Sequence, residues 1–251
     1  MADANCKQCG GTGWKIVERA GLSGAERCEC AVETRARDIK EGANIPPNYQ
    51  HATLDNFNIP KDNSIAANEL GTALRTVRKF VHYFPEPDRP GLLFTGPPGS
   101  GKTHLAVGAM KALLDKGHEC LFFDYQNLLD RIRSGYDSAS GAADREAYRS
   151  ALDAEVLVLD DLGAHRVTEW VEDTVTAIIT HRCNHRKPLI ATTNLSEEER
   201  IQEIAMPGGD KRTIRGKTLA EVIGVRAHSR LFEMCRVVRL AVDDYRMRRA
   251  R

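Results

Sequence analysis

The sequence predicts an α/β fold in which a parallel β-sheet carries helices on both faces, preceded by a small N-terminal metal-binding module. Short, continuously apolar segments alternate with segments whose apolar residues recur at helical spacing, which is typical of a parallel sheet buried on both sides. A glycine-rich octet stands between the first of these strands and its helix. Two close pairs of cysteines occupy the start of the chain, where large apolar side chains are few.

The 251-residue chain is long enough for one good-sized core and a small appendage. Its 36 Lys and Arg residues nearly balance 35 Asp and Glu, so the net charge of +1 does not by itself indicate a nucleic-acid-binding protein. Basic residues gather locally at 208–217 (GGDKRTIRGK) and 245–251 (YRMRRAR). Each segment is interpreted either as a solvated surface segment or as a patch that contacts phosphates. The sequence has no apolar run of membrane-spanning length and no secretion signal, so we expect a cytoplasmic protein with no membrane partner.

The two cysteine pairs predict a structural zinc site. Cys6 and Cys9 form a C-x-x-C pair, and Cys28 and Cys30 form a C-x-C pair. Four thiolates make a closed tetrahedral shell with no open position for water. Two disulfides are the alternative, but they need an oxidising compartment. Because segments under about 40 residues rarely fold without such a crosslink or metal, we expect residues 1–42 to form a zinc-binding module.

The main domain is expected at residues 64–251, after a linker at 43–63 that has two prolines and little periodicity. A helix is expected over 64–84, where PEPDRP ends it. The predicted strands are GLLFTG, CLFFDY, VLVLDD, PLIATTNL and VVRLA. The predicted helices between them cover 102–116, 126–133, 145–152 and 168–185, with further helical segments up to Met234.

The octet GPPGSGKT fits the pattern G-x-x-x-x-G-K-[ST] of a phosphate-binding P-loop, with a buried strand before it and an amphipathic helix after it. Its glycines and the positive N-terminal end of the helix suit the phosphates of a nucleotide. We expect Lys102 to reach the β- and γ-phosphates and the Thr103 hydroxyl to bind Mg²⁺. The expected nucleotide-binding residues are Gly96, Pro97, Pro98, Gly99, Ser100, Gly101, Lys102 and Thr103.

Polar residues at the ends of two later strands complete the predicted site. Asp160 ends the strand VLVLDD and is expected to hold Mg²⁺ together with Thr103. Asp161 is expected to orient and deprotonate the attacking water, although its side chain is one methylene shorter than that of Glu. Asn194, at the end of IATTNL, suits the lytic water or the γ-phosphate, with a loop cap as the alternative.

Two arginines, Arg226 and Arg230, stand four residues apart on one helical face. Such a pair is usually a solvated face. An arginine at this place in the chain can alternatively reach the γ-phosphate held by an adjacent subunit and stabilise the developing charge.

Together these motifs resemble those of AAA+ ATPases, with Gly96–Thr103 as Walker A, Asp160 and Asp161 as Walker B, Asn194 as sensor 1 and Arg230 as the arginine finger. More narrowly, the cysteine-rich start, the linker IPPNYQHATLDNF and the LDDLGA segment are similar to those of DnaC- and DnaI-type replicative helicase loaders. The resemblance covers essentially the whole chain.

The resemblance to helicase loaders implies a five-stranded parallel sheet of order 5-1-4-3-2 and Mg²⁺-dependent ATP hydrolysis. It also implies that the zinc-bearing segment contacts a hexameric replicative helicase of the DnaB/DnaC type, and that the ATPase domain binds single-stranded DNA and associates with copies of itself. Tyr49 and Phe57 are candidates for contact with the adenine, with ordinary packing as the alternative. One position departs from the pattern of such loaders: His165 stands where they often have an acidic residue. Arg246 is a candidate for contact with a phosphate or a partner.

We therefore expect an ATP-dependent helicase loader acting in replication initiation or restart. One rival with the same fold is an IstB-like transposition helper, against which the cysteine module argues. A second rival is a zinc adaptor in which ATP is only a structural ligand, and a third is a small-molecule nucleotide kinase, which has little use for four cysteines.

Overall fold

A five-stranded parallel sheet lies at the centre of the computed structural model, which describes residues 3–19, 22–137, 142–164, 167–198, 200–205, 211–242 and 244–245. The strands are β3 (Gly91–Thr95), β4 (Cys120–Asp124), β5 (Val156–Asp160), β6 (Leu189–Thr193) and β9 (Cys235–Arg239). Their spatial order is β4-β5-β6-β3-β9, and all four pairings are parallel. Numbered along the chain and read from the β9 edge, this is the predicted order 5-1-4-3-2, which is confirmed.

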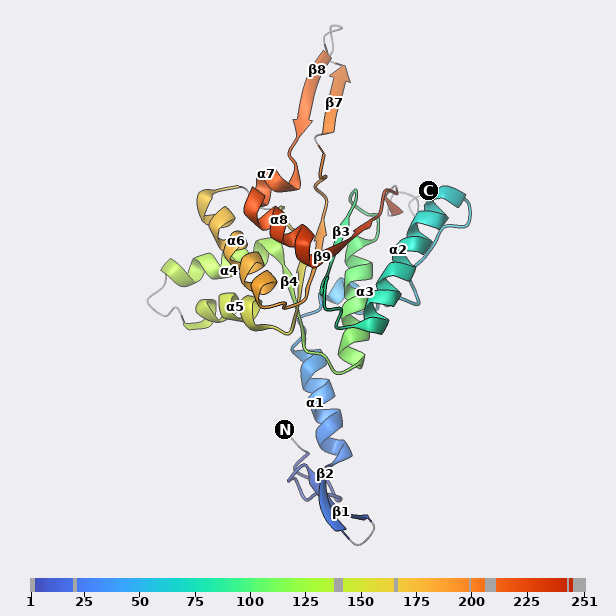
Figure 1. The fold of residues 1–251 in the computed structure, drawn as a ribbon, viewed down its shortest axis with the longest axis vertical. Helices are drawn as coiled ribbons and strands as arrows, with labels where there is room; N and C mark the ends of the chain where they lie inside the picture. Colours follow the sequence, from blue (N-terminus) through green and yellow to red (C-terminus); the bar gives the residue numbers. More distant parts are fainter. Residues whose placement is uncertain are drawn as a thin grey trace.

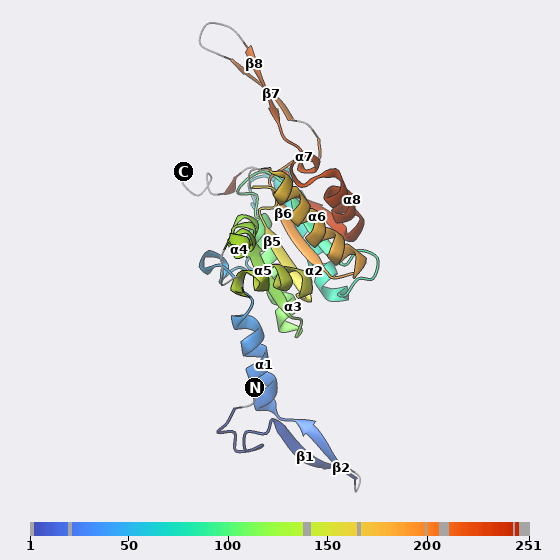
Figure 2. The same cartoon turned by 90° about the vertical axis from the view of Figure 1, so that its left-hand side faces the viewer.

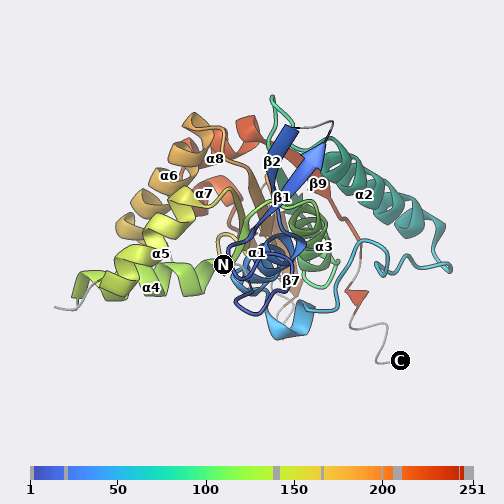
Figure 3. The same cartoon turned by 90° about the horizontal axis from the view of Figure 1, so that it is seen from below.

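Helices cover both faces of this sheet (Figures 1 and 3). Helices α2 (Ser64–Tyr83) and α3 (Lys102–Asp115) lie on one face. The opposite face carries α4 (Tyr125–Asp137), α5 (Ala142–Asp153), α6 (Glu169–Asn184), α7 (Leu219–Ile223) and α8 (Val225–Met234). Successive strand residues such as Leu92 and Leu93 are fully buried in opposite cores, because side chains alternate between the two faces of a strand.

The N-terminal part extends away from the domain (Figures 1 and 2). It contains an antiparallel hairpin of β1 (Trp14–Arg19) and β2 (Leu22–Arg27), followed by α1 (Glu29–Glu41). The end of α1 is fixed to the domain: Lys40 forms an ion pair with Asp115 at 2.7 Å, and the Phe122 amide donates to the Ala43 carbonyl. A short 3₁₀ turn, η1 (Pro47–Tyr49), follows in the segment 43–63. No helix in the described parts of the chain is both long and apolar enough to cross a bilayer.

A second antiparallel hairpin replaces part of the helical region expected before Met234, so that prediction was wrong for residues 200–205 and 211–216. Strands β7 (Arg200–Ala205) and β8 (Lys211–Gly216) pair antiparallel and extend beyond the domain on the side opposite α1 (Figure 1). The physical reason is visible in the sequence, where Pro-Gly and Gly-Gly pairs interrupt the helical spacing and Ile and Thr favour strands on both sides. Helices α7 and α8 then follow as expected.

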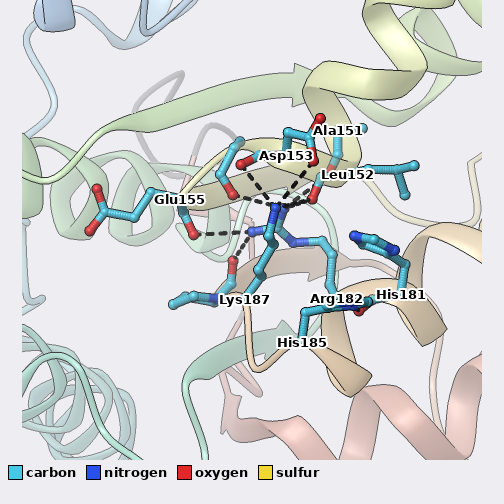
Figure 4. A network of polar contacts seen from close by, with 10 residues as sticks. Ala151, Leu152, Asp153, Glu155, His181, Arg182, His185 and Lys187 are labelled. Atoms are coloured by element: carbon cyan, nitrogen blue, oxygen red, sulfur yellow. Dashed lines mark hydrogen bonds and ion pairs between the residues drawn. The ribbon is translucent and has the colours of Figure 1, made fainter.

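A buried arginine lies at the amino ends of β5 and β6, whereas the P-loop follows the carboxyl end of β3. Figure 4 shows its polar contacts. Arg182, on α6, has no exposed surface, and its guanidinium donates to the carbonyls of Ala151, Leu152, Ala154, Glu155 and Pro188 at 2.6–3.4 Å. Burial lowers the pKa of this guanidinium to about 10, so it still carries its charge at neutral pH. It therefore satisfies carbonyls at the end of α5 and at the entries to β5 and β6.

Replacing Arg182 with methionine is expected to lower the free energy of unfolding by about 3 kcal/mol or more, because buried carbonyls lose their donors. The exposed Arg239→Met is the matched control, since its ion pair with Glu197 lies at the surface and is worth about 1 kcal/mol or less. Urea denaturation followed by circular dichroism measures both. Equal shifts for the two variants would show that the buried network does not hold the layers together.

Candidate nucleotide-binding site and metal centre

The P-loop connects the carboxyl end of β3 to α3. Gly99 and Gly101 both have positive φ, +70° and +98°, a backbone conformation that L side chains rarely adopt. A Cβ atom on Gly101 would lie 2.8 Å from the ring of Phe57, and one on Gly99 would collide with the carboxylate of Asp244. Glycine is therefore required at both positions, and the positive end of α3 opens directly onto this loop.

Lys102 and Thr103 begin α3 and hold the loop together. The Lys102 ammonium is buried and donates to the carbonyls of Gly96 and Pro97 at 3.0 and 2.8 Å. The neighbouring hydroxyl of Ser100 is buried, and no group of the described residues hydrogen-bonds to it. An orphaned donor beside a buried ammonium fits the oxygen atoms of a phosphate chain, so these residues suit a nucleotide.

The carboxylate of Asp160 lies next to this loop at the end of β5. The hydroxyls of Thr103 and Thr192 donate to it at 2.9 and 2.6 Å. Burial raises the pKa of the Asp160 carboxyl; the two hydroxyls oppose that shift, and the nearby charges of Asp161 and Asp124 add to it. A carboxylate that is costly to ionise and sits beside a threonine hydroxyl fits the donor set of Mg²⁺.

Asp161 and Asn194 form the next pair along the same edge. Asp161 has a positive φ of 60°, and its amide donates to the Thr192 hydroxyl at 2.9 Å. The Asn194 amide group donates to the Asp161 carboxylate at 2.5 Å. The structure thus brings together the two residues that the sequence predicted for water activation. Thr192, which contacts both aspartates, was missed; the signal was the pair of threonines, Thr192 and Thr193, that ends an otherwise apolar strand.

A cavity of about 1110 Å³ opens over the P-loop and contains most of the predicted residues. One wall comes from the segment 43–63, including Tyr49 and Phe57, and another from Val242 and Tyr245. Both aromatic candidates for base contact therefore line this cavity. Its lining comprises Asn48, Tyr49, Asn56, Phe57, Asn58, Pro60, Asp62, Ala66, Leu70, Pro98, Gly99, Ser100, Gly101, Lys102, Thr103, His104, Asp160, Asp161, Thr192, Asn194, Val242 and Tyr245.

The predicted arginine lies elsewhere. Arg230 is on α8, where it is exposed and donates to Glu233 at 2.7 Å, and it does not line the cavity. The structure does not bring it to the nucleotide site of its own chain. Two further positions of interest, His165 and Arg246, lie outside the described residues.

The four N-terminal cysteines converge. Their Sγ atoms all lie within 4.8 Å of one another, and the four thiols are free, so the disulfide alternative is not what the structure contains. Cys6 and Cys28 approach to 3.7 Å and Cys9 and Cys30 to 3.4 Å, close to the sulfur spacing of a tetrahedral site with bonds of about 2.3 Å.

The acidity of these thiols is uneven without a metal. Burial opposes ionisation of Cys9, but hydrogen bonds from Gly13, Cys30, Cys6 and Gly11 lower the pKa of its thiol to about 7. Burial, reinforced by the neighbouring thiols, raises the pKa of Cys30 to about 12. Without a metal the Cys9 thiol ionises near neutral pH and that of Cys30 does not, whereas a divalent ion would stabilise all four as thiolates. The donor set fits zinc.

A P-loop at the carboxyl edge of a parallel sheet of this order, with a threonine–aspartate pair beside it, defines an ATP-binding protein of the AAA+ P-loop class. More particularly, the chain belongs to the family of IstB-like ATP-binding proteins, whose model matches residues 31–251.

Replicative helicase loaders are among the relatives of this chain. The replicative helicase loader DnaC of Escherichia coli K12 is 23% identical over 204 residues, 79% of this chain and 80% of its own length. A crystal structure of the DnaC helicase loader superposes with a TM-score of 0.61 at 33% identity, covering 78% of this chain and 99% of that one. A crystal structure of DnaI shares the fold, with a TM-score of 0.59, 20% identity, and coverage of 79% and 95%.

Proposed function

We propose that this protein is an ATP-dependent loader of a hexameric replicative helicase of the DnaB/DnaC type, acting in the initiation or restart of DNA replication. The observation that carries the proposal is the similarity to the DnaC helicase loader, whose crystal structure matches 78% of this chain and 99% of its own. The cysteine module joined to that domain by α1 supports it.

ATP hydrolysis is the proposed reaction, and each residue of the site has a role in it. Lys102 would leave the loop carbonyls to bind the β- and γ-phosphates, and Thr103 and Asp160 would hold Mg²⁺, which would neutralise charge on the phosphates. Asp161 orients the attacking water and accepts its proton, and Asn194 holds that carboxylate in place. Arg230, exposed on α8, reaches the γ-phosphate bound by a neighbouring subunit.

The proposed helicase-binding element is the N-terminal module, with zinc held by the four cysteines. Its hairpin exposes large apolar side chains. Trp14 is 52% and Ile16 is 83% exposed, and because the two are two residues apart on β1, they lie on the same face of that strand. An exposed aromatic and aliphatic pair on a small rigid module is typical of a protein-docking surface.

Single-stranded DNA is the second proposed partner. The basic residues at 211–217 lie in and just after the hairpin of β7 and β8, which extends away from the domain (Figure 1). Contacts of such residues with phosphates release counterions, so DNA affinity is expected to fall steeply with salt.

Replacing Ile16 with glutamate is expected to weaken the complex with the replicative helicase of the same source by about tenfold or more, because a charge would be buried in the interface. Ile65→Glu is the matched control, since Ile65 is similarly exposed (73%) but lies on α2. Native mass spectrometry and surface plasmon resonance measure the complex with ATP and Mg²⁺. No helicase complex with the unmodified protein, in any nucleotide state, would overturn the loader proposal.

An IstB-like transposition helper is the second candidate, favoured by the family model itself. That function requires binding of duplex DNA and of a transposase. Stable binding to duplex DNA in preference to single strands, together with the absence of a helicase complex, would favour it.

A further inference from the structure

The segment 50–57 is packed along one face of the P-loop helix. It meets α3 at Gly101, His104, Gly108 and Lys111, positions three or four residues apart that share one helical face. A Cβ atom on Gly108 would lie 2.9 Å from the Leu54 side chain and 3.1 Å from its backbone nitrogen. The Lys111 ammonium donates to the Gln50 carbonyl. This segment is therefore a built part of the nucleotide-binding domain.

His104 makes the polar contact at the centre of this packing. Its Nε2 lies 2.9 Å from the Thr53 carbonyl and 3.0 Å from Oδ1 of Asn56. The same Oδ1 accepts from the Thr53 amide, and the Asn56 amide group donates to the His51 carbonyl, so the orientation of Asn56 is set. Both neighbours of Nε2 are then acceptors, which requires the imidazole to carry its proton on Nε2.

The turn of residues 53–57, which His104 contacts, also forms a wall of the nucleotide cavity. The imidazole meets the Phe57 ring edge to face, with centroids 5.4 Å apart. Phe57 in turn lies against Gly101 of the P-loop and lines the cavity. In the other direction the chain runs from Gln50 back to Ala43 and α1. One short turn thus contacts the nucleotide cavity and continues into the N-terminal module.

We propose that His104 is a positioning residue: it docks the turn 53–57 on α3 and so places Phe57 as the base-side wall of the nucleotide site. The inference rests on ATP binding and goes beyond it. A base that packs against the docked turn would stabilise docking when the nucleotide binds, and docking would raise nucleotide affinity by the same factor. Nucleotide occupancy is thereby linked to the segment that carries the N-terminal module.

The test compares two substitutions in the full-length protein. His104→Leu fills the same space without a donor, whereas His104→Gln retains an N–H donor that can reach the same acceptors. ADP affinity is measured by isothermal titration calorimetry, and amide hydrogen exchange of residues 50–57 is measured with and without ADP. Thermal unfolding of each variant establishes that the domain is folded.

We expect His104→Leu to weaken ADP binding by about threefold to tenfold, the loss of roughly one hydrogen bond, and to speed exchange of the 50–57 amides. His104→Gln should restore both. Equal ADP affinity in all three proteins, or weaker binding with unchanged exchange, would overturn the proposal. No helicase enters this experiment, so failure of the loader proposal leaves its result intact; if the unmodified protein bound no ADP, the ATP-binding premise would fail instead.

Discussion

Zinc chelation is expected to abolish helicase binding by this protein while leaving its basal ATP hydrolysis nearly unchanged. Neither β1 nor β2 has a buried side chain, so these strands have no core to hold them when the ion is removed. Binding of a structural zinc supplies about 10–16 kcal/mol in small metal-dependent modules, and that free energy is folding free energy. Without it the proposed docking surface around Trp14 and Ile16 is expected to lose its shape.

Cys9→Ser tests the same expectation without a chelator. Cys9 is buried, and hydrogen bonds lower the pKa of its thiol to about 7. Its replacement should therefore remove both a zinc ligand and the thiol whose pKa is lowered. Cys183→Ser, half-buried on α6, is the matched control and should bind helicase normally. Metal content by atomic emission, helicase binding and ATPase rate are measured on both. A metal-free Cys9→Ser protein that still bound helicase would show that the module acts without zinc.

Asp161→Asn is expected to lower kcat for ATP hydrolysis by about 10²-fold or more, because the amide cannot accept the proton of the attacking water. ATP affinity should change little, since Lys102, Thr103 and Asp160 remain. Asp161→Glu is the second variant, in which the carboxylate extends one methylene further. A kcat equal to or above that of the unmodified protein would indicate that the short side chain of Asp161 limits the rate of hydrolysis.

Single-turnover kinetics separate ATP binding from the chemical step for both variants of Asp161. A Lys102→Ala protein provides the background rate, because it lacks the ammonium that binds the phosphates. If the unmodified protein were no faster than this background, with and without DNA or helicase, ATP would be a structural ligand and the zinc-adaptor function would be favoured.

The sheet and the nucleotide site were predictable because short, contiguous sequence patterns specify both. Continuous apolar runs such as VLVLD specify strands buried on both faces, and the octet fixes one loop between strand and helix. Parallel strands end at one edge, so Asp160 and Asn194, on neighbouring strands, had to come near Lys102. The contact between Asn194 and Asp161 follows from the same register.

Two other features were not predicted, for different reasons. The hairpin of β7 and β8 was expected to be helical because its few apolar residues do not distinguish the two periods, although the Pro-Gly and Gly-Gly pairs in its sequence are typical of a turn. The irregular segment 43–63 has the composition of a linker, yet Ala52 and Leu54 are buried in the core. Its packing depends on a glycine and a histidine of α3, whose roles appear only when the segment is in place.

The packing of this segment on α3 also determines where the chain can be joined to an N-terminal module from another protein. An N-terminal module taken from another family member and joined at residue 63 would bring a foreign segment 50–57, which would have to match Gly101, His104, Gly108 and Lys111. A junction within α1, before Ala43, would keep the native match and transfer only the cysteines and the exposed hairpin. The exchangeable unit is therefore shorter than the sequence composition suggests, and chimaeras joined within α1 are the ones expected to exchange partner preference while keeping the nucleotide site.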